Sequence, residues 1–215
     1  MEYKNILYLI FIISFIFYNR NPKFNKKISL KYNDIKNNLD TGDIILFSCN
    51  ATFSNFIKKI SNSIFTHCGI IIKLYNKLFI LECDFDDEYD YITSSYKKGV
   101  HLVNLEKKIN MFGNLFCYRK LKGNKLEKKK LTNIIKKTYF YQFELNIIKL
   151  ILNYIGLNLF KSKNKMMCSE YISYVYYKIG VLKKINFSKC LPKFFCNNNI
   201  TQNNFYFDKL IFFKK

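Results

Sequence analysis

The stretch THCGIIIKLYNKLFILEC, residues 66–83, decides the fold, because two apolar runs flank a short polar turn. Such runs predict a β-hairpin that turns at Tyr75–Asn76. In that register Gly69 faces Glu82, and His67 lies on the same face of the hairpin as Glu82. A shift of one residue would place them on opposite faces. A carboxylate inside an apolar strand is costly unless it is paired, so we expect His67 to be its partner, with Gly69 leaving space beside them.

A second stretch, NKMMCSEYISYVYYKIG at residues 164–180, has the apolar spacing of a helix that begins at Cys168. Gly180 is a typical C-terminal stop. The unpaired N–H groups and the dipole at a helix start lower the pKa of a thiol, so Cys168 lies where a thiolate is favoured. A lone cysteine at a helix start is more often core filler, and a nucleophile needs an imidazole with its own orienting group.

Two histidines are available to such a cysteine, His67 and His101. His101 lies in the alternating segment GVHLV, where no carboxylate is placed to match it. His67 has Glu82 in the expected register. The residues therefore favour a Cys168–His67–Glu82 site about as strongly as a structural role for the three side chains.

The composition predicts one ordinary domain with a sizeable core, since the 215 residues are 49% hydrophobic and 18% aromatic. The formal net charge is +21, but only Arg20 and Arg119 are arginines among 36 basic residues. Phosphate and base recognition usually relies on arginine, so we expect no specific nucleic-acid binding. An AT-rich genome accounts for the lysines equally well, and a weak attraction to anionic membranes stays open.

Seven cysteines are scattered along the chain without a CxxC pair, and two histidines give no zinc-site spacing. We therefore expect reduced thiols, no metal site and no cofactor.

The N-terminal run ILYLIFIISFIFY, residues 6–18, is almost wholly apolar. As a helix it spans about 20 Å, short of a hydrocarbon core of about 30 Å. We interpret residues 1–20 as an uncleaved membrane anchor, with the basic flank holding the rest of the chain on the cytoplasmic side. A buried helix is the alternative. Residues 21–37 then form a basic, polar linker, and residues 38–215 form the domain.

The remaining pattern predicts an α+β fold, with helices packed on a mostly antiparallel sheet. The acidic segment DFDDEYDYITSS, residues 84–95, is interpreted as a solvated loop or lid. Expected strands are in residues 41–47, 99–105, 113–121 and the tail FYFDKLIFF, and expected helices are in residues 52–64, 125–140 and 143–159.

The order of these features resembles the permuted NlpC-type papain-like fold, above all its YiiX/YaeF-like group, which has relatives in poxviruses and other large DNA viruses. The resemblance covers residues 38–185 and is carried by TGDIILF, SNFIKKISNSIFTHCGIII, FILEC and MMCSEYISYVYYKIGVL. It implies that His67 is the general base, that Glu82 orients it and that Cys168 is the nucleophile.

Three further residues are candidates for lining the site. Asp43 in TGD either caps its turn or lines the site, and Glu170 is either a first-turn helix acid or a site residue. Tyr171 either packs in the core or donates near an oxyanion.

The leading hypothesis is a membrane-anchored thiol hydrolase that acts on amide or acyl substrates, with an oxyanion held by backbone N–H groups at the Cys168 helix start. A lipid acyl hydrolase or acyltransferase of the same fold is the second. A catalytically silent viral or host-membrane scaffold is the third.

Overall fold

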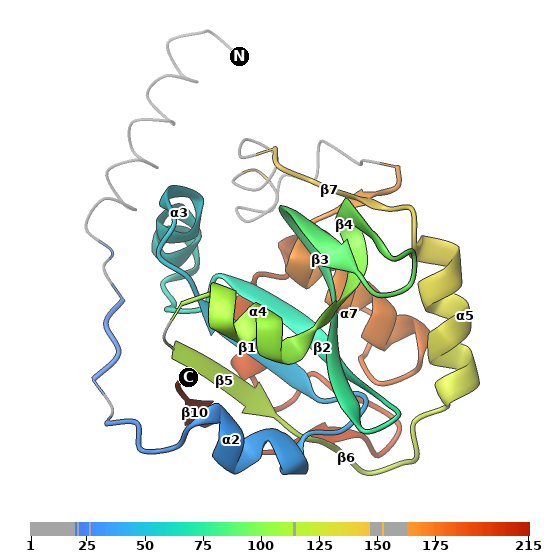
Figure 1. Cartoon of the computed structure of the whole chain (residues 1–215), viewed down its shortest axis with the longest axis horizontal. Helices are drawn as coiled ribbons and strands as arrows, with labels where there is room; N and C mark the ends of the chain where they lie inside the picture. The colour runs from blue at the N-terminus through green and yellow to red at the C-terminus, as the bar shows by residue number, and fades with distance from the viewer. Residues whose placement is uncertain (1–19, 21, 26, 114, 147–151, 153–162) are drawn as a thin grey trace, which may run out of the picture.

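The structure is a computed structural model of the chain, and it describes residues 20, 22–25, 27–113, 115–146, 152 and 163–215. Its centre is a six-stranded sheet in the order β10-β5-β1-β2-β3-β4, in which every neighbouring pair is antiparallel (Figure 1). The strands are β1 (Ile44–Ser48), β2 (His67–Leu74), β3 (Lys77–Asp90), β4 (Ser95–Asn104), β5 (Leu115–Arg119) and β10 (Ile211–Phe213).

Short strands and helices surround this sheet. Two small pairs are formed by β6 (Leu121–Lys122) with β9 (Tyr206–Phe207), and by β7 (Gln142–Phe143) with β8 (Lys165–Met166). The helices are α2 (Tyr32–Ile35), α3 (Thr52–Ser61), α4 (Leu105–Met111), α5 (Lys128–Thr138) and α7 (Cys168–Lys178), with 3-10 turns η1 (Lys36–Asn38), η2 (Phe187–Lys189) and η3 (Pro192–Cys196).

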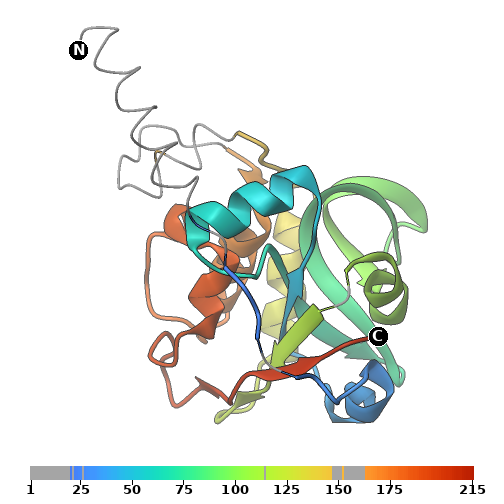
Figure 2. The ribbon, with the colours of Figure 1, turned by 90° about the vertical axis from the view of Figure 1, so that its left-hand side faces the viewer.

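Both faces of the sheet are covered, which explains why its inner strands read as continuous apolar runs. Residues from α5 and α7 pack on one face, where they join Ile44, Leu46 and Ile70 in the larger core. Residues from α2 and α4 pack on the other face with Ile45 and Phe47 (Figure 2). Successive strand residues therefore enter different cores, as the two-residue period of a strand requires.

The predicted hairpin and its register are confirmed. β2 and β3 pair from Ile70↔Leu81 to Leu74↔Lys77, which leaves Tyr75 and Asn76 as a two-residue turn. Both turn residues have positive φ, 46° and 61°, as a type I′ hairpin turn needs. This register places His67, Gly69 and Glu82 on the face that α2 and α4 cover.

The prediction of a solvated acidic loop over residues 84–95 is wrong. β3 continues to Asp90 across a β-bulge between Asp84 and Glu88, and only residues 91–94 turn before β4 begins. Asp84, Glu88 and Asp90 are buried, because their carboxylates find partners inside the protein. The sequence pattern also gave no indication of α4, which directly follows β4.

Most other predicted elements appear with shifted ends. The expected helices over 52–64 and 125–140 are α3 and α5, and the tail supplies β10. Within the predicted linker, α2 contributes Tyr32 and Ile35 to the core.

Two predictions fall largely on residues outside the described ones. The membrane anchor over residues 1–20 lies outside them except for Arg20, and it stays a prediction. The predicted helix over 143–159 also lies mostly outside the described residues, but its start is wrong, because Phe143 belongs to strand β7. Among the residues described, no helix combines the length and the apolar character needed to cross a bilayer.

Gly69 gives a direct test of the packing between the two hairpin strands. A Cβ at this position would lie 2.4 Å from Cγ1 of Ile80, so the glycine makes room for that side chain rather than for the His67–Glu82 pair. We expect Gly69→Ala to lower the free energy of unfolding by about 1–3 kcal/mol, through overpacking.

Urea denaturation measures this loss. In an Ile80→Ala background the loss should be smaller, because the overlapping atoms are gone. Equal losses in the two backgrounds would contradict the proposed contact.

Candidate active site

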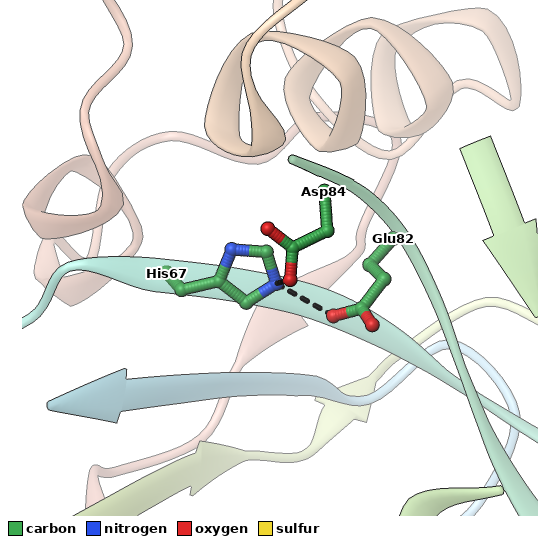
Figure 3. Close-up of side chains that lie close together, drawn as sticks. All are labelled: His67, Glu82 and Asp84. Carbon is green, nitrogen blue, oxygen red and sulfur yellow. Dashed lines mark hydrogen bonds and ion pairs between the residues drawn. The ribbon is translucent and has the colours of Figure 1, made fainter. Parts of the chain in front are cut away.

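The centre of the candidate site is a short contact between His67 and Glu82 across the hairpin. Nε2 of His67 lies 2.6 Å from Oε2 of Glu82, and both residues are buried (Figure 3). An ionised carboxylate only accepts hydrogen bonds, so Nε2 is the donor. The second ring nitrogen points away from Glu82 and can serve another group on that side.

Asp84 supplies a second carboxylate beside the same imidazole. It follows Glu82 by two residues on β3, and its Oδ2 lies 3.8 Å from Nε2 of His67. The backbone N–H of Phe85 donates to Oδ1 of Asp84 at 2.7 Å. Sequence reasoning placed Asp84 in a loop, although its two-residue spacing from Glu82 was a signal that both share one strand face.

Cys168 is the first residue of α7, and its thiol lies close enough to the side chains of His67 and Cys68 for both to act on its ionisation. Helix α7 packs on the sheet face opposite Glu82. His67 is the first residue of β2, so the side chains of His67 and Cys168 meet at the end of that strand. The neighbouring Cys68 side chain, followed by the positive charge of His67, lowers the pKa of Cys168 to about 5 despite its burial.

The charge of His67 is set by the groups around it. Burial by itself lowers the pKa of an imidazole, but the negative charges of Asp84, Cys168 and Glu82 raise the pKa of His67 well above its ordinary value. A lowered thiol pKa beside a raised imidazole pKa describes a thiolate–imidazolium pair. This is the charge state in which a cysteine is a nucleophile.

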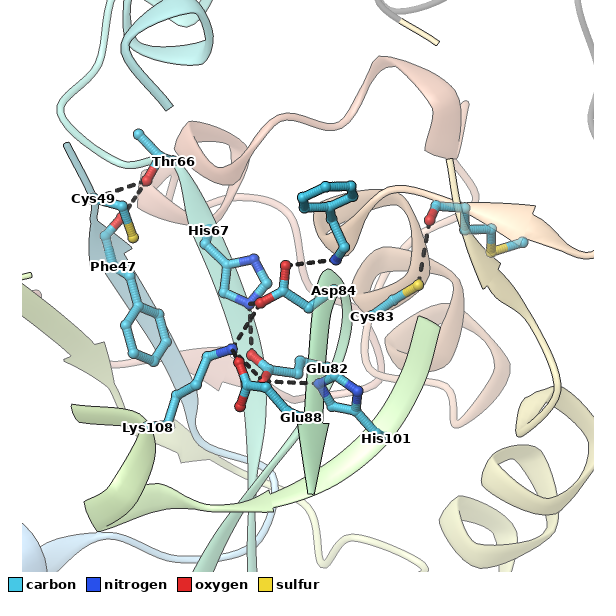
Figure 4. Close-up of polar contacts among 12 residues, drawn as sticks. Phe47, Cys49, Thr66, His67, Glu82, Cys83, Asp84, Glu88, His101 and Lys108 are labelled. Atoms are coloured by element: carbon cyan, nitrogen blue, oxygen red, sulfur yellow. Dashed lines mark hydrogen bonds and ion pairs between the residues drawn. The ribbon is translucent and has the colours of Figure 1, made fainter. Parts of the chain in front are cut away.

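A buried network holds the other side of Glu82. Its Oε1 lies 2.7 Å from Nζ of Lys108 and 3.1 Å from Nε2 of His101. Lys108 belongs to α4 and also contacts Asp84 at 2.7 Å and Glu88 in a short ion pair (Figure 4). Glu82, His101 and Lys108 are all fully buried.

His101 corrects the expectation that no carboxylate matches it. β3 and β4 pair Glu82 directly with His101, so the two histidines approach one carboxylate from the two neighbouring strands. Lys108 is the other member that sequence reasoning missed. Its helix gave no local signal, and a lysine among many lysines does not stand out.

Histidine and acidic side chains of this network are close enough together to share a cation. The ammonium of Lys108 already lies against Glu82, Asp84 and Glu88, so a divalent ion at that point would have to displace it. The donor set therefore fits a built-in lysine cation better than a resident metal ion.

A cleft of about 340 Å³ opens onto Cys168 and His67. Asp84 and Cys49 also line it, together with apolar side chains from several elements, namely Phe53, Phe85, Met111, Phe112, Phe143 and Met167. A larger hollow of about 460 Å³ beside α2 has a polar lining with no cysteine or histidine among its described residues. The first cleft therefore combines Cys168 and His67 with apolar space.

The additional site candidates lie away from the cleft. Asp43 accepts hydrogen bonds from the N–H groups of Asp40 and Leu121 at 3.0 and 2.9 Å, and burial raises its pKa to about 6. Tyr171 is buried in the core with its hydroxyl 3.2 Å from that of Thr138. These two residues support the scaffold and do not line the cleft.

Glu170 lies in the first turn of α7, and its Oε2 accepts from the N–H of Met167 at 3.4 Å. This contact fixes the start of the helix that presents Cys168. The same helix is held further along, where the hydroxyl of Tyr176 donates to the carbonyl of Gly42 at 2.8 Å and that of Ser169 donates to the carbonyl of Cys190 at 2.6 Å.

The fold and site define an α+β protein with a cysteine, a histidine and a carboxylate brought together at a cleft. No protein-family model matches the chain. An uncharacterized protein of Acanthamoeba polyphaga mimivirus is 29% identical over 182 residues, which are 73% of this chain and 72% of that protein. The crystal structure of the metalloprotein YiiX from Escherichia coli O157:H7 has a TM-score of 0.48 and 17% identity, and the match covers 82% of this chain and 97% of YiiX.

The contrast among the thiols leads to a direct measurement. We expect iodoacetamide to alkylate Cys168 with a midpoint near pH 5, because its thiolate persists to that pH. Cys190 and Cys196, whose pKa values burial raises to about 11, should react only in strongly alkaline solution. Site-by-site mass spectrometry after timed labelling measures each rate.

His67→Ala is the informative variant in the same experiment. Without the imidazolium, the midpoint for Cys168 should move up toward the ordinary thiol value of about 8.5. A Cys168 midpoint that does not depend on His67 would show that the two side chains do not form the pair described.

Proposed function

We propose that this chain is a cysteine hydrolase of the permuted papain-like, NlpC-type class, acting on an amide, ester or thioester. The supporting observation is the arrangement around one imidazole. His67 donates from Nε2 to the buried Glu82, while its ring also meets the Cys168 thiol at the start of α7. In this proposal Cys168 is the nucleophile, His67 the base and Glu82 the group that orients the base.

In the first step the Cys168 thiolate attacks the carbonyl carbon, and the π electrons move to the carbonyl oxygen. Backbone N–H groups at the start of α7 would stabilise this oxyanion, since the first N–H groups of a helix have no partner within it. The oxyanion then reforms the carbonyl, the bond to the leaving group breaks, and the His67 imidazolium gives its proton to that group. An acyl thioester on Cys168 remains.

In the second step water attacks the thioester carbonyl, and neutral His67 accepts a proton from it. Collapse of the second oxyanion releases the acid and returns the thiolate and imidazolium. Glu82 keeps the ring oriented throughout by accepting the Nε2 proton, and it supports the positive charge on the ring.

A narrower substrate class, acyl esters or thioesters with an apolar acyl chain, is favoured by the lining of the cleft. Aromatic and methionine side chains from α3, β3, α4 and β7 surround the space that opens onto Cys168. An apolar chain would be desolvated there at about 25 cal/mol per Å² of buried surface. Such an enzyme would act as an acyl hydrolase or, with an alcohol or amine in place of water, as an acyltransferase.

Activity against p-nitrophenyl esters and peptide p-nitroanilides tests the proposal with the full chain. We expect Cys168→Ser to reduce hydrolysis to background, and Glu82→Gln to lower kcat/KM by about 10²-fold. Cys196→Ser should keep full activity. A Cys168→Ser protein as active as the parent would refute the assignment of the nucleophile.

The pH dependence of kcat/KM should be bell-shaped. Activity rises as Cys168 ionises near pH 5, and it falls on the alkaline side as the imidazolium of His67, whose pKa is raised, loses the proton that the leaving group needs. An acid limb centred near pH 8.5 would contradict the thiolate–imidazolium pair.

Chain-length preference separates the two substrate classes. If apolar acyl chains bind in the cleft, Phe143→Ala should raise KM for an octanoyl ester more than for an acetyl ester. Phe140→Ala, a neighbouring and exposed phenylalanine, serves as the matched control. Equal effects on both esters, or faster cleavage of peptide amides than of esters, would favour an amidase instead.

A further inference from the structure

We propose that Lys108 is a positioning residue for the hydrolase site, because its ammonium fixes the carboxylate that orients His67. This inference rests on the proposed function, and it adds a residue that touches neither the cleft nor the reacting atoms. Lys108 acts through Glu82, whose two oxygens are divided between the imidazole and the ammonium.

The division of Glu82 between its partners is the first argument. Oε2 faces His67 at 2.6 Å, whereas Oε1 faces Lys108 at 2.7 Å and His101 at 3.1 Å. Three donors from β2, β4 and α4 thus determine the orientation of one carboxylate plane. Without the ammonium, His101 alone would hold Oε1.

The burial of Lys108 is the second argument. A fully buried ammonium is costly unless carboxylates neutralise its charge. Asp84 and Glu88 already supply two such partners. The third contact goes to Glu82, the carboxylate that accepts the hydrogen bond from Nε2 of His67. A purely structural lysine on α4 would not need that contact.

The surroundings of Lys108 determine the sign of its effect. Lys108 directly contacts Glu82, Asp84 and Glu88 on β3, and the centroid of the Phe112 ring lies 3.9 Å from its Nζ. His101 on β4 and His67 on β2 lie on the other side of Glu82. The Cys49 thiol after β1 is also within range of the ammonium's charge. The Lys108 ammonium therefore lies among three buried carboxylates. Its ammonium lowers the pKa of Glu82, so its removal would let Glu82 take up a proton.

A protonated Glu82 no longer accepts from the imidazole as a charged partner. The His67 imidazolium would then lose support, and the thiolate of Cys168 would lose its counter-ion. We therefore expect Lys108→Met to raise the midpoint of Cys168 alkylation by about one pH unit, which makes the reaction about twofold slower at pH 6 and about tenfold slower at pH 4. The full chain is used, and Lys107→Met, an exposed neighbour on the same helix, is the matched control.

A charge-balanced pair of variants separates positioning from net charge and from loss of folding. Glu88→Gln removes one carboxylate, and Glu88→Gln with Lys108→Met restores the net charge of the parent network. Lys108 and Glu88 are in direct contact, so their joint removal leaves the distant field at Cys168 nearly unchanged. A raised midpoint in the double variant, with Glu88→Gln near the parent value, supports positioning through Glu82.

The opposite outcomes are distinct. A Cys168 midpoint that stays near pH 5 in both Lys108→Met and the double variant overturns the role of Lys108 and leaves the proposed hydrolase intact. A parent protein whose Cys168 reacts only near pH 8.5 overturns the proposed function itself, and with it the inference about Lys108.

Discussion

The structure depends on how one carboxylate, that of Glu82, is accommodated inside a sheet that is buried on both faces. Desolvation opposes its charge, yet Lys108, His67 and His101 together hold its pKa well below the ordinary value. Each partner comes from a different element, so the carboxylate can be satisfied only when β2, β3, β4 and α4 are assembled. The same requirement that stabilises the fold therefore delivers an oriented imidazole to the end of β2.

The position of His67 at that strand end resolves an apparent conflict of faces. Glu82 and His67 lie on the face covered by α2 and α4, whereas α7 packs on the opposite face. In the middle of the sheet the backbone would separate a thiol on α7 from the imidazole. At the first residue of β2 the sheet ends, and the first residue of α7 reaches the ring. Cys168 therefore belongs to one core, whereas His67 lies on the sheet face of the other.

Local chemistry explains which features the sequence predicted correctly. The two-residue turn, the strand period and the helix start at Cys168 are encoded within a few neighbouring residues, so the hairpin register and the His67–Glu82 contact followed from them. Lys108 and His101 could not be recognised in this way, because their partner is distant in sequence. The acidic end of β3 was misread because charged residues favour loops unless a buried cation, here Lys108, lies opposite them. The catalytic roles themselves stay predictions.

The excess of acidic groups gives this network a direction. Three carboxylates face a single ammonium, and Oε2 of Glu88 has no hydrogen-bond partner within the described part of the chain. Burial raises the pKa of Glu88, yet the remaining negative charge still favours a proton on His67. The thiol of Cys168 lies beside the same ring and carries a proton that can move to it. A network with more negative than positive charges therefore favours transfer of that proton to the imidazole, and this would give the thiolate–imidazolium state that the proposed hydrolase needs.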